Sequence, residues 1–186
     1  MPSDTYEAIL WVSRRLFMQK GYASTSMSQI AGEVGIGKAT IYHHFMDKQA
    51  ILSALLDNIS KALPTPQDSL GQGNGPHVRI RELVKKVVAF YRQNSDILQV
   101  ISREAPDLKP QVTAVVERLN DFYSSGLVKE IQSGVEHGIF RPLEGPAVVR
   151  VLMAVVEGLS SNSQFPGHEE KELDVVLDIF FHGIDA

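Results

Sequence analysis

Apolar residues recur at helical spacing along nearly the whole of this 186-residue chain, and no stretch keeps the alternation of apolar and polar side chains that marks a half-buried strand. Glycines and prolines interrupt the helical pattern at intervals, as they do where one helix ends and the next begins. Hydrophobic residues make up 44% of the chain, which is enough to bury a core. The sequence therefore predicts an all-α protein.

Composition excludes several kinds of site. The chain contains no cysteine, so disulfides, thiolate metal sites and cysteine nucleophiles are excluded. The longest apolar run, 151–156, is far shorter than the roughly 20 residues that span a membrane. The N-terminus, Met1-Pro2-Ser3-Asp4, lacks the basic and apolar stretches of a signal peptide. We therefore expect a soluble, cytoplasmic protein without a membrane segment.

A segment poor in apolar residues divides the chain. Residues 64–76 contain three prolines and three glycines, which favour a flexible linker. The glycine spacing also resembles a nucleotide-binding loop, but no strand precedes it, so a linker is the better interpretation. The predicted organisation is an N-terminal domain at 1–46, a connecting helix at 47–63, the linker at 64–76, and a helical bundle at 77–186 with helices at about 77–94, 96–104, 110–137, 146–163 and 168–184.

The N-terminal domain contains start and stop signals for three short helices. Ser3 or Asp4 can cap the first helix, which ends at Gly21. A capping box, Ser26-Met27-Ser28-Gln29, opens the second helix. A third helix at 38–45 follows after the short turn Gly35-Ile36-Gly37. Two short helices joined by such a turn form a helix-turn-helix, here at about 26–45.

The third helix has one narrow apolar side. At about 100° per residue, Ile41 and Phe45 face the interior. The outer face and flanks carry small, hydroxylic, imidazole or basic side chains: Ala39, Thr40, His43, Lys38, Tyr42 and His44. Such a helix can enter the major groove of DNA. A small helical domain of another function can contain the same turn, so geometry alone leaves DNA binding open.

The net charge of −4 is unevenly distributed. Residues 1–48 contain five Lys or Arg and four acidic residues, whereas the rest of the chain contains 13 and 18. A nearly neutral N-terminal domain beside an acidic body indicates two different tasks.

The N-terminal residues contain a run of closely spaced motifs: Gly21-Tyr22-Ala23-Ser24-Thr25-Ser26, Ile30-Ala31, Gly35-Ile36, Lys38-Ala39-Thr40-Ile41-Tyr42-His43-His44-Phe45, Lys48 and Ile51-Leu52. This pattern resembles the TetR family of bacterial transcription regulators. The resemblance implies a three-helix DNA-binding domain and a divergent C-terminal domain for ligand binding and dimerisation. It also implies a homodimer on near-palindromic, double-stranded operator DNA, usually a repressor that a small molecule releases, without cofactor or metal.

The resemblance also assigns roles to individual residues. By position, it places Thr25, Thr40, Tyr42 and Lys48 at phosphates, adds Ser26 as a DNA-binding residue, and places Lys38, Ala39 and His43 near base edges. Gly37 stands where a capping serine is common, a loss worth roughly a few tenths of a kcal/mol. Ala39 stands where glycine is frequent. Trp11 occupies an outward position that is usually polar, and the sequence offers no reason for it.

The last two predicted helices are apolar on more than one side. Helix 146–163 is apolar nearly all round, and the final helix has two apolar stripes, one of them Val175 and Ile179. A helix with two apolar sides needs two partners. One well-buried core is one explanation, and a two-fold dimer, which the resemblance also implies, is the other. The residues assigned to the dimer interface are Val148, Val151, Leu152, Val155, Leu173, Val176, Leu177, Phe180 and Ile184.

An effector pocket is expected among the helices from 77 to 163. Gly126 and Gly134 interrupt helix 110–137 at a cost of about 1 kcal/mol each relative to alanine, which suggests close packing, a kink or a cavity. We interpret Gly126 as part of the pocket wall. Aromatic liners favour an apolar or amphipathic effector, whereas Glu104 and Glu157 leave a cationic one open. The candidate liners, each more often core or surface, are Phe90, Tyr91, Phe122, Tyr123, Gly126, Met153 and Glu157.

An enzyme and a partner-controlled regulator are the alternatives. His43 and His44 have a helical spacing to Asp47 that could hold a metal, but all three belong to the DNA-facing end, where solvated surface is the better interpretation. The sequence contains no phosphate loop, nucleophile elbow or zinc-protease motif, so we predict no enzymatic activity. A regulator of the same fold that responds to a protein partner instead of a small molecule stays open.

Overall fold

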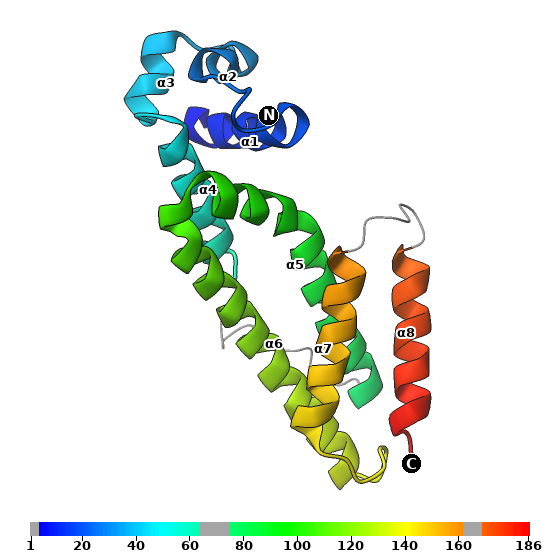
Figure 1. Cartoon of the computed structure of the whole chain (residues 1–186). Coiled ribbons are helices and arrows are strands. Elements are labelled where there is room, and N and C mark those ends of the chain that lie inside the picture. Colours follow the sequence, from blue (N-terminus) through cyan, green and yellow to red (C-terminus); the bar gives the residue numbers. More distant parts are fainter. Residues whose placement is uncertain (1–3, 64–74, 162–168) are drawn as a thin grey trace. The chain divides into compact units, whose positions relative to one another are not determined.

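The computed structural model describes residues 4–63, 75–161 and 169–186. Within these residues every regular element is a helix, which confirms the all-α prediction, and an isolated bridge joins Phe140 and Asp185. None of the described helices is long and apolar enough to cross a membrane. The helices are α1 (Thr5–Lys20), α2 (Met27–Val34), α3 (Lys38–His44), α4 (Lys48–Lys61), α5 (Pro76–Glu104), the 3-10 helix η1 (Pro106–Leu108), α6 (Lys109–Glu136), α7 (Gly145–Ser161) and α8 (Glu169–Ile184) (Figure 1).

The chain forms two compact units. The N-terminal unit combines residues 4–63 with 94–116, so it contains α1 to α4, the end of α5, η1 and the start of α6. The C-terminal unit contains the start of α5, the rest of α6, α7 and α8. This division differs from the predicted boundary at 77, because the chain returns to the N-terminal helices at residue 94.

The predicted break between helices 77–94 and 96–104 is wrong, because α5 runs through it. Asn94 is buried at 9% exposure, and its Oδ1 accepts a hydrogen bond from Arg14 Nη1 at 3.5 Å. Burial lowers the pKa of Arg14, and the negative charge of Asp96 opposes that effect. A contact to α1, far away in the sequence, therefore accommodates a polar residue inside the helix.

Local sequence predicts the helix ends of the N-terminal unit correctly. Ser26 Oγ accepts from the Gln29 N–H at 3.2 Å, and Gln29 Oε1 accepts from the Ser26 N–H at 2.7 Å, which completes the capping box of α2. Asp47 caps α4. Gly21 and Gly35 follow α1 and α2 with φ of 85° and 83°, a region that residues with a Cβ rarely adopt.

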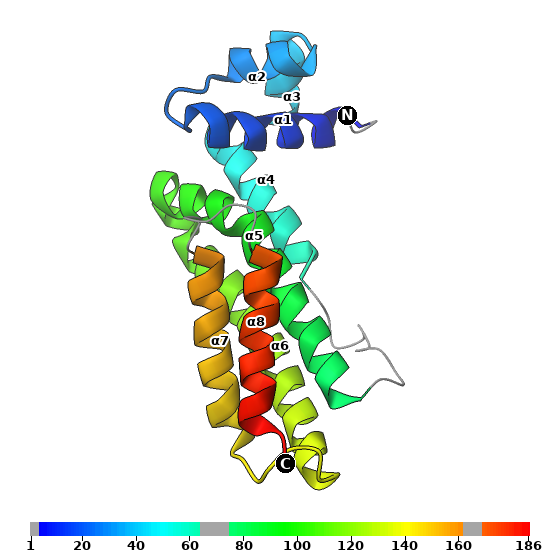
Figure 2. The same ribbon diagram turned by 90° about the vertical axis from the view of Figure 1, so that its right-hand side faces the viewer.

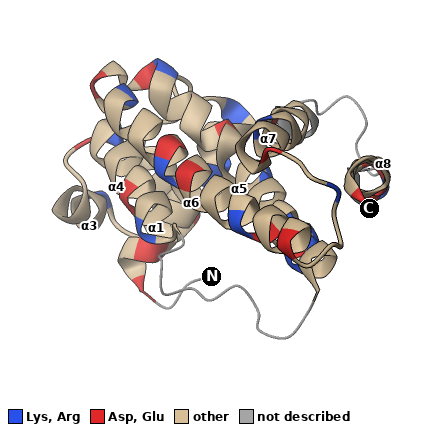
Figure 3. Cartoon of the chain, turned by 90° about the horizontal axis from the view of Figure 1, so that it is seen from below, with Lys and Arg blue, Asp and Glu red and all other residues tan. Residues whose placement is uncertain are grey.

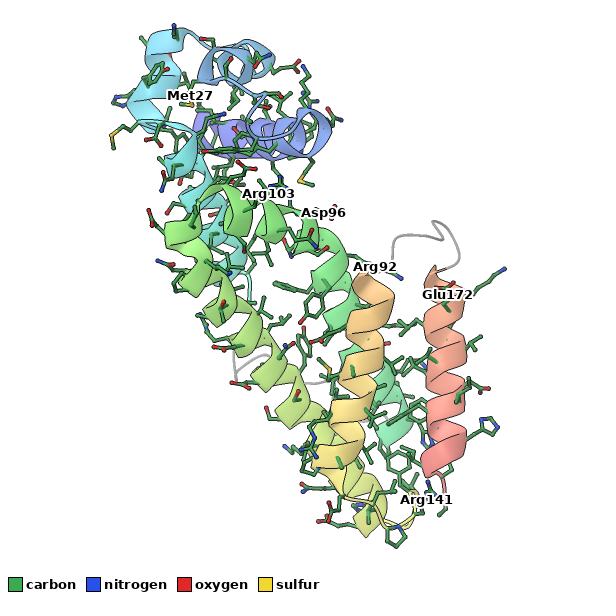
Figure 4. All side chains as sticks on the ribbon, viewed as in Figure 1. Met27, Arg92, Asp96, Arg103, Arg141 and Glu172 are labelled. Atoms are coloured by element: carbon green, nitrogen blue, oxygen red, sulfur yellow. The ribbon has the colours of Figure 1, made fainter. Side chains whose placement is uncertain are left out.

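The interior of the helix-turn-helix is a small apolar core. Helix α1 packs against α2 and α4, and α2 packs against α3 (Figure 2). The ring of Tyr6 stacks on Phe45 with centroids 5.0 Å apart, which joins the start of α1 to the end of α3. The side chains that fill this core are at most 7% exposed: Ile9, Val12, Leu16, Phe17, Met27 (labelled in Figure 4), Ile30, Ile41 and Phe45.

In the C-terminal unit, α7 and α8 lie side by side and run in opposite directions (Figures 1 and 2). Glu172 marks the beginning of α8 and Arg141 the loop before α7 (Figure 4). The end of the chain is hydrogen-bonded to that loop: the Arg141 N–H donates to Ile184 O at 2.9 Å, and the Ala186 N–H donates to Ile139 O at 3.2 Å. These bonds hold the C-terminal residues against the α6–α7 connection.

Two ion pairs join α5 to other helices of the C-terminal unit. Arg79 Nε lies 2.6 Å from Glu130 Oε2 on α6, and Arg81 Nη1 lies 2.7 Å from Asp174 Oδ1 on α8. Glu130 is only 6% exposed, so its charge depends on a close partner. Figure 3 shows basic and acidic residues mixed along α5 and α6.

Close packing explains Gly134 in α6, because a Cβ at this position would overlap the ring of Phe140. We expect Gly134→Ala to destabilise the protein by about 1–3 kcal/mol, since the ring must move. Gly183→Ala on α8 is a matched control, because nothing lies within 4 Å of the added Cβ. Denaturant unfolding of both variants tests this, and an unchanged midpoint for Gly134→Ala would contradict it.

Candidate functional site

The third helix, α3, turns most of its surface to solvent. Ile41 is fully buried and Phe45 is 4% exposed, as predicted, and these two side chains anchor the seven-residue helix. Gly37 at the N-cap supplies no side-chain hydrogen bond. The remaining side chains are therefore available to an approaching surface. The exposed residues are Lys38, Ala39, Thr40, Tyr42 and His43.

Thr25 differs from the other predicted DNA contacts. Its side chain is 2% exposed, and its Oγ1 donates to the carbonyl oxygen of Gly21 at 2.9 Å. The hydroxyl therefore satisfies a backbone acceptor where α1 ends. The phosphate contact predicted for the Thr25 side chain does not fit this geometry, whereas its neighbour Ser26 is exposed at the start of α2. The sequence does not reveal that the hydroxyl turns back toward α1.

Lys48 is held in place by Tyr22, a partner that sequence reasoning missed. Its Nζ donates to the Tyr22 carbonyl oxygen at 2.6 Å and lies 4.3 Å from the centroid of the Tyr22 ring. An ammonium has three donors, so others remain for a phosphate. Burial raises the pKa of the Tyr22 phenol, and the charges of Asp47 and Glu104 raise it further, so the phenol is neutral at physiological pH.

Trp11 has a structural partner on its own helix. It is 49% exposed, and the guanidinium carbon of Arg15 lies 5.0 Å from the ring centroid. Arg15 Nη2 is also 2.6 Å from Glu33 Oε2, so the ring supports an ion pair between α1 and α2. This contact accounts for an aromatic residue at an outward position. Met46, between α3 and α4, is 79% exposed and was not among the predicted DNA contacts.

The exposed apolar surface of the C-terminal unit includes one stripe on each of two adjacent helices. Val151 and Val155 on α7 are 67% and 40% exposed. Val175 and Ile179 on α8 are 58% and 67% exposed. Residues four apart share a helix face, so each pair forms a continuous stripe. We call these four residues the α7–α8 face.

The structure divides the residues predicted for the dimer interface. Leu152, Leu173, Leu177 and Ile184 are at most 5% exposed within their own chain, so they do not fit an interface between chains. The sequence shows two apolar stripes on the final helix but not which one faces the chain's own core. The stripe left outside contains Val175 and Ile179. The half-buried members of the predicted set are Val148, Val176 and Phe180.

The predicted effector residues lie in the C-terminal unit with different exposure. Tyr123 and Met153 belong to the core, at 5% and 7% exposure. Glu157 is exposed. The half-buried members are Phe90, Tyr91, Phe122 and Gly126.

Two of the predicted effector residues, Tyr91 and Glu157, approach the same side chain. Tyr91 Oη donates to Asn120 Oδ1 at 2.8 Å, and Asn120 Nδ2 lies 3.5 Å from Glu157 Oε1. These residues come from α5, α6 and α7. Asn120 was not predicted, because nothing in the local sequence of α6 indicates which neighbours its side chain meets.

A short exposed helix that follows a capped helix and a glycine turn is the arrangement of the helix-turn-helix, a motif whose second helix enters the major groove in many DNA-binding proteins. The family model described as "Bacterial regulatory proteins, tetR family" matches residues 9–55, and the one described as "Tetracyclin repressor-like, C-terminal domain" matches residues 73–161. The chain belongs to the TetR family of transcriptional regulators, whose members bind DNA and are not enzymes.

Known proteins resemble the chain over nearly its full length. The HTH-type regulator YhgD of Bacillus subtilis is 20% identical over 183 residues, which is 97% of this chain and 96% of YhgD. A putative regulator of Saccharomonospora viridis, solved with choline, is 23% identical with a TM-score of 0.71 and full coverage of both chains. AibR, solved with isovaleryl coenzyme A and operator DNA, is 21% identical with a TM-score of 0.64, covering 96% of this chain and 98% of AibR. At these identities the solved structures support the fold.

Two hydroxyl deletions separate structural from DNA-contacting roles. Thr25→Val removes the bond to Gly21 O and should cost about 1 kcal/mol of stability without changing the salt dependence of DNA binding. Tyr42→Phe should leave stability unchanged and weaken binding to all DNA sequences alike, with the slope of log affinity against log salt unchanged, because a neutral hydroxyl releases no counterion from DNA. Thermal unfolding and DNA titrations at several salt concentrations measure both effects. A DNA affinity that falls in Thr25→Val as much as in Tyr42→Phe would return Thr25 to the DNA contacts.

Proposed function

We propose that this protein binds a near-palindromic operator as a homodimer, represses the adjoining genes and leaves the operator when a small molecule binds among α5, α6 and α7. The open face of α3 carries the proposal. On this face Lys38, Ala39 and His43 reach base edges, and Ala39 allows α3 to approach the DNA closely because its side chain is small. Ser26, Thr40, Tyr42 and Lys48 contact phosphates, which fixes the register of the helix in the groove. Such a regulator acts in the cytoplasm, where the chromosome lies.

The α7–α8 face supports a homodimer. Four exposed aliphatic side chains on neighbouring helices would lose contact with water if the same face of a second chain covered them. A two-fold axis pairs each stripe with its mate and makes a four-helix bundle. The same symmetry presents two α3 helices to half-sites one turn of DNA apart, about 34 Å, or a multiple of it.

Small-molecule control is supported by relatives of the same fold. One solved relative holds choline, and another holds isovaleryl coenzyme A together with operator DNA. An effector that prefers the DNA-free arrangement by about 1–3 kcal/mol weakens operator binding roughly 5- to 150-fold. In this chain we assign the half-buried aromatic residues Phe90, Tyr91 and Phe122 to such a site.

Selection of genomic DNA fragments by the purified protein tests the proposal. We expect a near-palindromic fragment bound by two chains, with log affinity falling linearly with log salt. Genes next to the selected site then identify compounds to test for release, and reporter expression separates repression from activation. Weak binding without a preferred sequence would contradict operator recognition. Failure of every small compound, with release by a cellular protein, would replace the effector by a protein partner.

A charge on the α7–α8 face should break the dimer. Ile179→Asp places a carboxylate on an apolar side chain that is 67% exposed in the single chain, so folding is retained while association is lost. Val78→Asp is the matched control, because Val78 is an exposed aliphatic residue on α5, outside this face. Sedimentation velocity should show monomers for Ile179→Asp and dimers for the control. A dimeric Ile179→Asp variant would place the interface elsewhere.

A further inference from the structure

A chain of hydrogen bonds runs from Tyr91 through Asn120 to Glu157. Tyr91 Oη donates to Asn120, and the Asn120 amide nitrogen points its donor toward Glu157. Burial raises the pKa of Tyr91, the hydrogen bond with Asn120 opposes that effect, and the charge and hydrogen bond of Glu157 raise the pKa further, so Glu157 also reaches the Tyr91 hydroxyl. The Tyr91 hydroxyl proton and one Asn120 amide proton are therefore already used in hydrogen bonds among these three residues. We call these three residues the polar triad.

The unfilled positions of the polar triad are mainly acceptors. A carboxylate has two oxygens and about four lone-pair sites, of which the contacts with Asn120 and the Tyr91 hydroxyl use two. The Tyr91 oxygen keeps its lone pairs after donating its proton. Only one Asn120 amide proton remains as a donor. A group that satisfies this arrangement must bring hydrogen-bond donors, and donors that carry a positive charge, as ammonium N–H groups do, suit the carboxylate best.

The charge of Glu157 is not balanced by the two side chains that reach it, because Tyr91 and Asn120 are neutral. On α7, the nearest basic residue on the same face is Arg150, two turns earlier and roughly 10 Å along the axis. This distance is about one Debye length at physiological salt, so the attraction in water is weak. Since no ion pair joins Glu157 to another of the described side chains, a cationic ligand would gain this interaction without displacing one of them.

Apolar and aromatic residues flank the polar triad along its three helices, and the ring centroids of Phe90 and Tyr91 are 6.0 Å apart. Phe90 and Phe122 are half-buried, and Tyr123 and Met153 are buried at 5% and 7% exposure. Burial is also the largest cause of the raised pKa of Tyr91, which shows that its hydroxyl lies in a partly desolvated position. A ligand here would place an apolar body against rings and its charged end at Glu157. Ring faces also attract cations.

We propose that the effector is an organic ammonium compound with an aromatic or aliphatic body, whose N–H groups donate to Glu157 and Tyr91. This inference rests on the proposed small-molecule control and specifies the chemical class. Glu157 sets the preference for charge, and Tyr91 and Asn120 orient the ammonium group. Neutral and anionic compounds of the same shape bind more weakly, because a neutral donor lacks the charge attraction to the carboxylate and an anion is repelled by it.

Three probes of nearly one shape test the charge preference: phenethylammonium, phenethyl alcohol and phenylpropionate. Binding to the purified protein is measured by calorimetry and thermal shift. We expect the ammonium compound to bind about tenfold more tightly than the alcohol, and the carboxylate to bind weakest. Equal binding of the three, a preference for the alcohol or the carboxylate, or no binding at millimolar concentration would overturn the inference.

Isosteric variants test the residues. Glu157→Gln removes the charge and should abolish the preference for ammonium, and Tyr91→Phe should reduce it while keeping the ring. Glu82→Gln, on the exposed surface of α5, is the matched control and should keep the full preference. Circular dichroism melts confirm that each variant folds. An unchanged ammonium preference in Glu157→Gln would overturn the assignment of this site.

Operator-binding assays with the same probes separate this inference from the proposed function. Release of DNA by a neutral or anionic compound, but not by ammonium compounds, would overturn the ligand class and leave small-molecule control intact. Ammonium binding that depends on Glu157 but leaves operator affinity unchanged would support the binding site and contradict release by this ligand.

Discussion

The DNA-binding unit depends on the burial of two side chains, Ile41 and Phe45. Helix α3 has only seven residues, and an isolated helix of that length is unstable in water. It forms because these side chains enter the core between α1 and α2, where Phe45 also stacks on Tyr6. One narrow stripe is enough to hold the helix. Because only this stripe is buried, the opposite side of α3 is exposed, and a DNA groove can accept that exposed side.

In the C-terminal unit, the last two helices, α7 and α8, have more apolar surface than one chain covers. The inner stripe of α8, with Leu173 and Leu177, packs within the chain, while Val175 and Ile179 remain outside. Between α5, α6 and α7, the polar triad supplies hydrogen bonds that join the three helices. A second chain would cover the exposed apolar stripe. A ligand with hydrogen-bond donors would satisfy the free acceptors of the polar triad.

Much of this architecture could be predicted where the signal lies within a few residues. The capping box of Ser26 and Gln29 and the glycine after α1 were predicted and are present. The continuity of α5 was not predicted, because Asn94 is accommodated by Arg14 on another helix. Thr25 and Lys48 were assigned to phosphates from the family pattern, whereas their contacts to Gly21 and Tyr22 appear only after folding.

The sequence by itself determined that this chain is all-helical, where its short N-terminal helices begin and end, and which residues of α3 face outward. Helix periodicity and capping are interactions between residues three or four apart, so they can be read along the chain. The tertiary structure decided which apolar stripe of α8 meets its own core, which hydroxyl turns back to the backbone, and which polar residues meet near Glu157. The Thr25 hydroxyl bonds to a backbone carbonyl only four residues away, but no local pattern selects that bond. The other two outcomes depend on side chains that are distant in sequence and adjacent only after the helices pack.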